Sequence, residues 1–222
     1  LEKNGRIIKT NGYINDVITD EAISFIKESK QPFLSFISYN TPHSPMQVPD
    51  KYYLNKKVSL VGRYSNKENI NKTKSALGMI ENIDENIGNI VSVLKEKDVY
   101  DNTIIIFTSD NGLAVGQHGL LGKQNLYEHS VRVPLIISGP GIKNGERTES
   151  LVYLNDVFPT VADIVGIEKP ETIDGLSLLP ILKDSKATVR ESVYFSYKNF
   201  QRGVRTKNWK LIKYLVEGKK TT

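Results

Sequence analysis

The middle of the chain repeats apolar residues at helical spacing. Between positions 70 and 94 these residues lie three, four or seven positions apart, with Glu, Asn and Lys between them: Ile70, Leu77, Ile80, Ile83, Ile87, Val91 and Leu94. This period predicts a long amphipathic helix over 68–97. Weaker signals predict two more helices, one over 19–29 with Thr19 as its N-cap and one over 156–166.

Short apolar runs alternate with these helices and predict strands. Residues 33–39 form one such run and are expected to be a buried strand. Residues 103–108 and 133–138 are apolar on both faces, which is the pattern of central parallel strands covered by helices. Residues 50–67 show no period and are expected to cross the surface irregularly. Together these patterns predict an α/β fold.

The pattern changes from residue 188 onward, where short strand-like runs follow one another at hairpin spacing with no helix between them. These runs are 193–197, 203–205 and 209–214. We therefore expect a main domain over 1–187 and the start of a small antiparallel subdomain over 188–222. Residues 217–222 are typical of a hairpin turn whose second strand is missing, and no leader precedes Leu1. The expectation is a chain truncated at both ends.

Composition narrows the chemistry. The chain has no cysteine, which excludes thiol nucleophiles, zinc–thiolate sites, iron–sulfur clusters and disulfides. The formal net charge of +5 mildly favours an anionic substrate. Basic residues are not concentrated enough to predict a nucleic-acid partner, and no apolar run is long enough to predict a membrane span.

Polar residues gather between the two apolar runs, over 109–130, where an α/β sheet commonly builds its site. Asp110 and Asn111 offer hard oxygen ligands for Ca²⁺ or Mg²⁺, although Asp-Asn-Gly is also ordinary turn chemistry. Lys123 could neutralise an anionic group or have no specific role. His43 lies between prolines and could donate a proton, contact a sulfate or phosphate, or be an exposed loop residue. The residues alone leave these alternatives open.

The order of several motifs along the chain is more specific than any one of them. They are Thr41-Pro-His-Ser-Pro45, Phe107-Thr-Ser-Asp-Asn-Gly112, Gly116-Gln-His-Gly-Leu-Leu-Gly-Lys123, Tyr127-Glu-His-Ser-Val-Arg-Val-Pro134 and Ser138-Gly-Pro-Gly141. This set closely resembles the sulfatase family. The resemblance covers nearly the whole chain and includes the turn at Asp174–Leu178 and the strand pair over 205–214.

The resemblance implies a fold and a set of roles. The fold would be that of alkaline phosphatase, a mixed sheet between helices with a small antiparallel C-terminal subdomain, and 1–187 would be the C-terminal part of the catalytic domain. Asp110 and Asn111 would be ligands of one Ca²⁺. Lys123 would bind the sulfate, and His43 would lie beside the leaving oxygen.

Other residues of these motifs receive weaker assignments from the resemblance. Glu128 and Arg132 would be structural. His118 and His129 fall where the family varies, so either could touch substrate, although a structural or supporting role is favoured for both. Of the two, His118 is the candidate substrate-binding residue.

The chain also departs from the family pattern. Sulfatases use a formylglycine made from Cys or Ser in a Cys/Ser-x-Pro-x-Arg motif, and no such motif is present. The expectation is a sulfatase in the full-length protein, acting on a sulfated glycan or aryl sulfate and exported from the cytosol, with this stretch inactive by itself. The alternatives are a phosphomonoester, phosphodiester or phosphonate hydrolase of the same superfamily, or a non-catalytic binder of sulfated glycans. The oligomeric state is not predicted.

Overall fold

The computed structural model describes residues 1–60, 65–216 and 219–221. The chain forms two compact units, unit one over 1–103 and unit two over 104–222, and each is described by itself. The predicted division into 1–187 and 188–222 stays a prediction.

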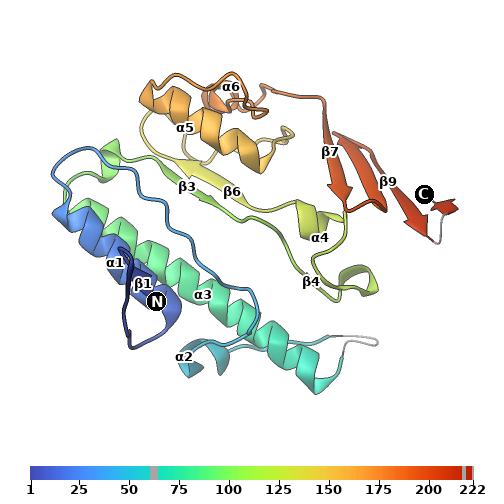
Figure 1. Ribbon diagram of the computed structural model, residues 1–222, viewed down its shortest axis with the longest axis horizontal. Coiled ribbons are helices and arrows are strands. Elements are labelled where there is room, and N and C mark those ends of the chain that lie inside the picture. Colours follow the sequence, from blue (N-terminus) through green and yellow to red (C-terminus); the bar gives the residue numbers. More distant parts are fainter. Residues whose placement is uncertain (61–64, 217–218, 222) are drawn as a thin grey trace. The chain divides into compact units, whose positions relative to one another are not determined.

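Unit one is built on two helices, α1 (Ile14–Glu28) and α3 (Lys67–Glu96), which pack along each other (Figure 1). Shorter elements complete the unit: β1 (Glu2–Lys3), β2 (Arg6–Ile7), α2 (Asp50–Tyr53) and η2 (Tyr100–Asn102). The predicted helix over 68–97 is confirmed, and the Asn66 side chain caps it by accepting a hydrogen bond from the Asn69 amide at 2.9 Å. Of its predicted apolar stripe, Ile83 and Leu94 are buried, whereas Leu77 and Ile80 are exposed.

Helix α1 begins five residues earlier than the sequence predicts. Thr19 is not its N-cap but lies within the helix, where its hydroxyl donates to the Asn15 carbonyl at 2.8 Å. Both Asn15 and Thr19 are fully buried. The prediction was wrong because a short polar side chain commonly marks a helix start, whereas here it faces the interior of unit one.

The predicted strand over 33–39 is extended but is not a strand. Its side chains alternate in exposure, and Leu34 and Phe36 are 78% and 92% exposed. No described strand pairs with it, so the expectation of a buried strand is wrong for the described residues. The region over 50–67 contains α2, whose Tyr52 is buried, while residues 61–64 lie outside the described residues.

Unit two contains β3 (Ile105–Thr108) paired with β6 (Leu135–Ser138). The two strands are antiparallel, with Ile105 opposite Ser138 and Thr108 opposite Leu135, so the prediction of parallel strands is wrong for this pair. Apolar residues on both faces indicate that a strand is covered on both faces by other elements, but they do not specify whether its neighbour runs parallel or antiparallel. Between β3 and β6 lie β4 (Ala114–Val115), η3 (Gln117–Gly119), β5 (Leu121–Gly122) and α4 (Glu128–Val131).

Beyond β6 the chain forms η4 (Leu154–Asp156), α5 (Val157–Val165) and α6 (Leu179–Lys183). The helix predicted over 156–166 is confirmed, and Gly166 ends it in the left-handed region at φ 72°. Asp156, at the start of α5, is completely buried.

An antiparallel sheet closes unit two, with strands in the order β10, β9, β8, β7. Its strands are β7 (Ser192–Tyr197), β8 (Gln201–Thr206), β9 (Lys210–Val216) and β10 (Lys219–Thr221). The predicted antiparallel strands are therefore confirmed. The prediction that the last hairpin lacks its second strand is wrong, because β10 pairs with β9; residues 217, 218 and 222 lie outside the described residues.

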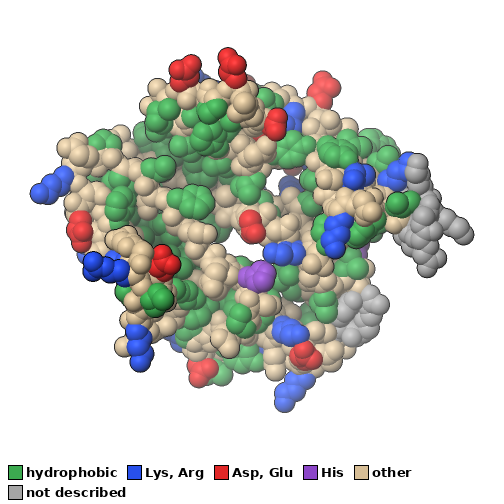
Figure 2. All heavy atoms as spheres, viewed as in Figure 1, with side chains coloured by type: hydrophobic (Ala, Val, Ile, Leu, Met, Phe, Trp, Pro, Cys, Tyr) green, Lys and Arg blue, Asp and Glu red, His purple; other side chains and the backbone are tan. Residues whose placement is uncertain are grey.

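The surface carries charges of both signs. In Figure 2 the Lys and Arg side chains lie singly or in small groups, with Asp and Glu side chains among them. In the described part of the chain, no helix combines the length and apolar character that crossing a bilayer requires.

Candidate functional site

The Asp110–Gly112 turn follows β3 and is held against α4. The Gly112 amide donates to the Ser130 carbonyl at 2.9 Å. A Cβ atom at Gly112 would lie 2.0 Å from the His129 carbonyl oxygen, so only glycine permits this approach. The backbone that directly follows the Asp-Asn pair is thereby fixed to the His129–Ser130 segment.

Local hydrogen bonds orient Asn111. Its amide nitrogen donates to the Gly112 carbonyl at 2.8 Å, and the Ser109 hydroxyl donates to the Asn111 carbonyl at 2.9 Å. The Asn111 Oδ1 atom is therefore the part of the side chain that is left to act as a ligand. The neighbouring Asp110 is exposed.

Two adjacent hard oxygens suit a calcium ion, although Ca²⁺ takes six to eight oxygens. Within the described residues, no group of three or more His, Cys, Asp or Glu side chains converges on one point. The donor set of Asp110 and Asn111 therefore fits part of a calcium shell and not a complete one.

Lys123 directly follows β5, the second strand of the β4–β5 hairpin. It is half-buried, and its carbonyl accepts the Asn125 amide at 3.0 Å. Among the residues that the structure describes, no carboxylate pairs with its ammonium group. Its positive charge is thus available for an anionic ligand.

Three rings cluster in the same unit. His118 stacks on Tyr127 with centroids 4.5 Å apart, and His129 lies 5.7 Å from His118. The His129 Nε2 atom is buried without a hydrogen-bond partner in the described structure. Burial, with added repulsion from the charges of His118 and Lys210, holds the pKa of His129 below its usual value. His118 is exposed and therefore open to a ligand.

The sequence did not identify Tyr127, Tyr214 and Lys210 as members of this region. Tyr127 hydrogen-bonds to Tyr214, and burial together with that bond raises the pKa of Tyr214 to about 12. Lys210 donates to Glu128 Oε1 at 2.8 Å. Tyr127 could have been found from the sequence, because it directly precedes Glu128 and His129. Lys210 and Tyr214 could not, because they lie some 80 residues further along the chain.

Glu128 links α4 to the antiparallel sheet, since Lys210 lies on β9 and Arg205 on β8, with Arg205 Nε 3.5 Å from Glu128 Oε1. Burial alone would raise the pKa of Glu128, but these cations outweigh it and the pKa is lowered. Arg132 is exposed and its amide donates to the Glu128 carbonyl at 2.8 Å. The contacts agree with a structural role for Glu128.

His43 belongs to unit one and lies on the proline-rich loop that follows residues 33–39. Its side chain is exposed, and Nδ1 donates to the Ser44 carbonyl at 2.9 Å. That bond leaves Nε2 as the outward atom of the ring. Its predicted place beside the leaving oxygen stays a prediction.

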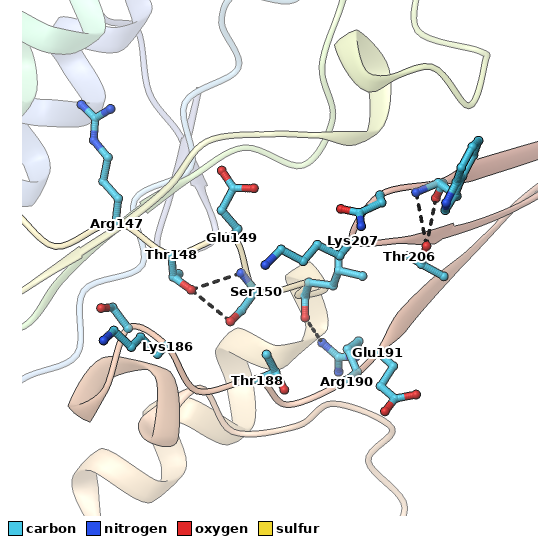
Figure 3. Close-up of a pocket in the computed structure, with 14 residues that line it drawn as sticks. Arg147, Thr148, Glu149, Ser150, Lys186, Thr188, Arg190, Glu191, Thr206 and Lys207 are labelled. Atoms are coloured by element: carbon cyan, nitrogen blue, oxygen red, sulfur yellow. Dashed lines mark hydrogen bonds between the residues drawn. The ribbon is translucent and has the colours of Figure 1, made fainter.

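A groove of about 760 Å³ lies elsewhere in unit two, among residues 147–151, 185–191 and 206–209 (Figure 3). Hydroxyl groups such as those of Thr148 and Ser150, 3.0 Å apart, contribute to its lining. Charges of both signs surround it, and none of the predicted site residues lines it.

Comparison with protein families gives two matches. The Sulfatase family model matches residues 2–167, and the model for the C-terminal region of N-sulphoglucosamine sulphohydrolase matches residues 116–221. The N-acetylglucosamine-6-sulfatase of Bos taurus is 32% identical over 86% of this chain and 40% of its own length. The extracellular sulfatase SULF-1 homolog of Drosophila melanogaster is 30% identical over 86% of this chain and 20% of its own length. The chain therefore spans less than half the length of these relatives.

Solved structures show the fold. The structure of BT4656 with its substrate D-glucosamine-2-N,6-O-disulfate matches with a TM-score of 0.86 and 23% identity, over 96% of this chain and 63% of that one. A phosphonate monoester hydrolase of Agrobacterium radiobacter matches with a TM-score of 0.79 and 22% identity, over 90% and 52%. These likenesses confirm the predicted fold class, the α/β fold of the alkaline phosphatase-like kind.

Proposed function

The chain belongs to the sulfatase family, and on that premise we propose that the protein hydrolyses sulfate esters of a glucosamine-containing glycan. The observation that carries the proposal is the 32% identity to an N-acetylglucosamine-6-sulfatase over 86% of the chain. The substrate bound to BT4656, a sulfated glucosamine, supports the same class.

The residues of the site have roles in this reaction. Lys123 would contact the sulfate oxygens, where its ammonium stabilises the negative charge of the ester and of the transition state. His43 would present Nε2 to the leaving oxygen as a hydrogen-bond partner, while the bond from Nδ1 to Ser44 holds the ring in place. His118, exposed and supported by Tyr127, would contact the sugar or its substituents.

Asp110 and Asn111 would hold a calcium ion together with ligands from outside these residues. When bound, the ion would add positive charge beside the sulfate oxygens. We include no nucleophile among the 222 residues, because the family uses a formylglycine and this chain has neither Cys nor the corresponding Ser motif. The formylglycine would be supplied by another part of the protein.

The location of the protein is part of the same proposal. One relative is named an extracellular sulfatase. We therefore propose that the protein acts in the periplasm, outside the cell or in a lysosome.

The substrate class can be tested by comparing three esters with the purified intact protein: 4-nitrophenyl sulfate, 4-nitrophenyl phosphate and 6-O-sulfated N-acetylglucosamine. We expect release of sulfate from the first and third, little release of phosphate, loss of activity on calcium chelation and recovery when calcium is returned. Turnover of the phosphate ester alone would favour phosphate ester hydrolysis over sulfate ester hydrolysis. Binding of the sulfated sugar without turnover would show a non-catalytic binder.

A further inference from the structure

The loop that carries His43 has no sheet to hold it. Residues 29–49 form no helix or strand, and three prolines at positions 42, 45 and 49 remove amide donors from the loop. Within unit one, the position of the imidazole must therefore depend on other contacts. Those contacts are two backbone bonds within the loop, from the His43 amide to the Asn40 carbonyl and from the Gln47 amide to the Pro45 carbonyl, together with side-chain hydrogen bonds from α1 and its N-cap.

Three residues at or near the start of α1 reach this loop. The Tyr13 hydroxyl donates to the Gln47 carbonyl at 2.9 Å. The hydroxyl groups of Thr19 and Tyr39 share a hydrogen bond at 2.8 Å. The Asn15 amide donates to Thr41 Oγ1 at 2.7 Å, two residues before His43. Of these three side-chain bonds, the one from Asn15 lies nearest to His43 in sequence, and the His43 amide itself donates to the Asn40 carbonyl at 3.3 Å.

Asn15 is itself fixed by α3. Its amide nitrogen also donates to Asn82 Oδ1 at 2.9 Å, and both side chains are completely buried. The Asn82 amide then donates to Asp16 Oδ1 at 2.8 Å, so its orientation is set by a carboxylate on α1. A buried amide that makes several hydrogen bonds has little conformational freedom. The Asn15 side chain therefore fixes Thr41 relative to α1 and α3.

Removing the Asn15 side chain would leave the half-buried Thr41 hydroxyl oxygen and the buried Asn82 Oδ1 without this donor. Acceptors left without a donor form hydrogen bonds with other groups or with water, and the loop would shift or open as they do so. Misplacement of a reacting group by about 1 Å can cost about 100-fold in rate. The His43 imidazole is close enough in sequence to Thr41 to follow it.

We propose that Asn15 is a positioning residue for His43, joining α1 and α3 to Thr41 and thereby fixing the loop that presents the imidazole. The catalytic part of this role presupposes the sulfate ester hydrolysis proposed above. The structural part does not, because it concerns only contacts within unit one.

The chain offers a matched control in Asn86. Its side chain belongs to the same buried network, donates to Asp16 Oδ1 at 2.9 Å and is 4% exposed. It makes no described hydrogen bond to residues 39–47. Asn86→Ala therefore removes a buried amide of α3 without removing a contact of the His43 loop.

The first experiment measures hydrogen–deuterium exchange over 40–48 in the intact protein. Asn15→Ala should speed exchange there by about tenfold or more, and Asn86→Ala should leave it within about twofold of wild type. Thr41→Val, which removes the same bond from the loop side, should reproduce the Asn15→Ala result and serves if that variant does not fold. Equal exchange in Asn15→Ala, Thr41→Val and Asn86→Ala would overturn the proposal.

The second experiment measures sulfate ester hydrolysis. Asn15→Ala should lower kcat by about 10- to 100-fold with little change in KM, and Asn86→Ala should not. In a His43→Ala background, Asn15→Ala should cause less than about a twofold further loss, because its effect passes through the missing imidazole. If Asn15→Ala lowers kcat as much in the His43→Ala background as in wild type, its role is merely structural. If the wild type cleaves no sulfate ester, the proposed function fails, while the exchange experiment still decides the positioning.

Discussion

Asp156→Ala is expected to lower the free energy of unfolding by about 3–5 kcal/mol, because it leaves a buried guanidinium without its partner. The Asp156 carboxylate is completely buried and pairs with Arg190 through both oxygens, with Nη2 2.7 Å from Oδ1. It also accepts the backbone amides of Tyr153 at 2.7 Å and Leu176 at 2.8 Å. One side chain therefore ties together η4, the turn over 174–178 and the segment that leads into β7.

The loss should appear as a fall of roughly 6–20 °C in Tm, measured by thermal unfolding at pH 7. The control is Asp163→Ala, because Asp163 pairs with Lys169 at the surface, where the two side chains are 26% and 33% exposed. That variant should lose less than about 1 kcal/mol. Equal losses in the two variants would contradict the role assigned to the buried pair.

The same pair predicts a pH dependence. Burial would by itself raise the pKa of Asp156, but Arg190 and the two backbone amides outweigh burial and the pKa is lowered. The stabilisation is therefore complete above the unfolded-state pKa of about 3.9 and is lost as pH falls through the lower folded-state value. In urea unfolding below about pH 4, the free energy of unfolding of Asp156→Asn should fall less steeply with decreasing pH than that of wild type. An equal fall in the free energy of unfolding with pH in the two proteins would contradict this role of the Asp156 carboxylate.

Gly112→Ala is expected to destabilise unit two by about 3 kcal/mol and to displace the Asp110–Asn111 turn. The new Cβ would lie 2.0 Å from the His129 carbonyl oxygen and 3.2 Å from the Ser130 Cα, and all of these contacts are backbone atoms. Backbone cannot rotate aside as a flexible side chain can. The turn and α4 must separate, and the bond from the Gly112 amide to Ser130 is then lost.

Gly88→Ala is the matched control. Gly88 lies in α3, where a Cβ would meet nothing within 4 Å. Alanine is favoured over glycine within a helix, so this variant should be more stable by roughly 0.5–1 kcal/mol. Urea unfolding of both variants gives the comparison. A Gly112→Ala protein as stable as wild type would show that the turn and α4 are not in the close contact described.

Elements that bury one regular apolar stripe could be predicted from sequence. Helix α3 was placed within one residue at each end, because its apolar residues keep a helical period over 30 residues. The sheet over 192–216 was recognised from strand-like runs joined by short turns. The motifs likewise led to the family without any knowledge of contacts.

Features that depend on distant partners could not be predicted. Thr19 has the composition of a helix start, yet it is buried within α1, where its hydroxyl bonds the Asn15 carbonyl and the distant Tyr39 hydroxyl. The direction of β6 relative to β3 is not encoded in the apolar character of either strand. The contact of Gly112 with His129 joins residues 17 positions apart, and a local Asp-Asn-Gly pattern indicates only a turn.

In the candidate site, too, some residues could be predicted from the sequence and others could not. Motif order along the chain names Lys123, Asp110 and Asn111 as candidates, and their roles stay predictions. It does not name the contacts of other motif residues, such as Tyr127 stacked on His118 or Lys210 bonded to Glu128. Lys210 comes from another element and carries no motif of its own.

The most direct test of the central claim is the effect of Lys123→Ala on kcat/KM for a sulfate ester in the intact, calcium-loaded protein. Loss of a charge that faces the sulfate should lower kcat/KM by about 100- to 1,000-fold. Lys143→Ala, which removes an exposed lysine after β6, should stay within about twofold of wild type. Hydrolysis by Lys123→Ala at the rate of Lys143→Ala would contradict the assignment of this site.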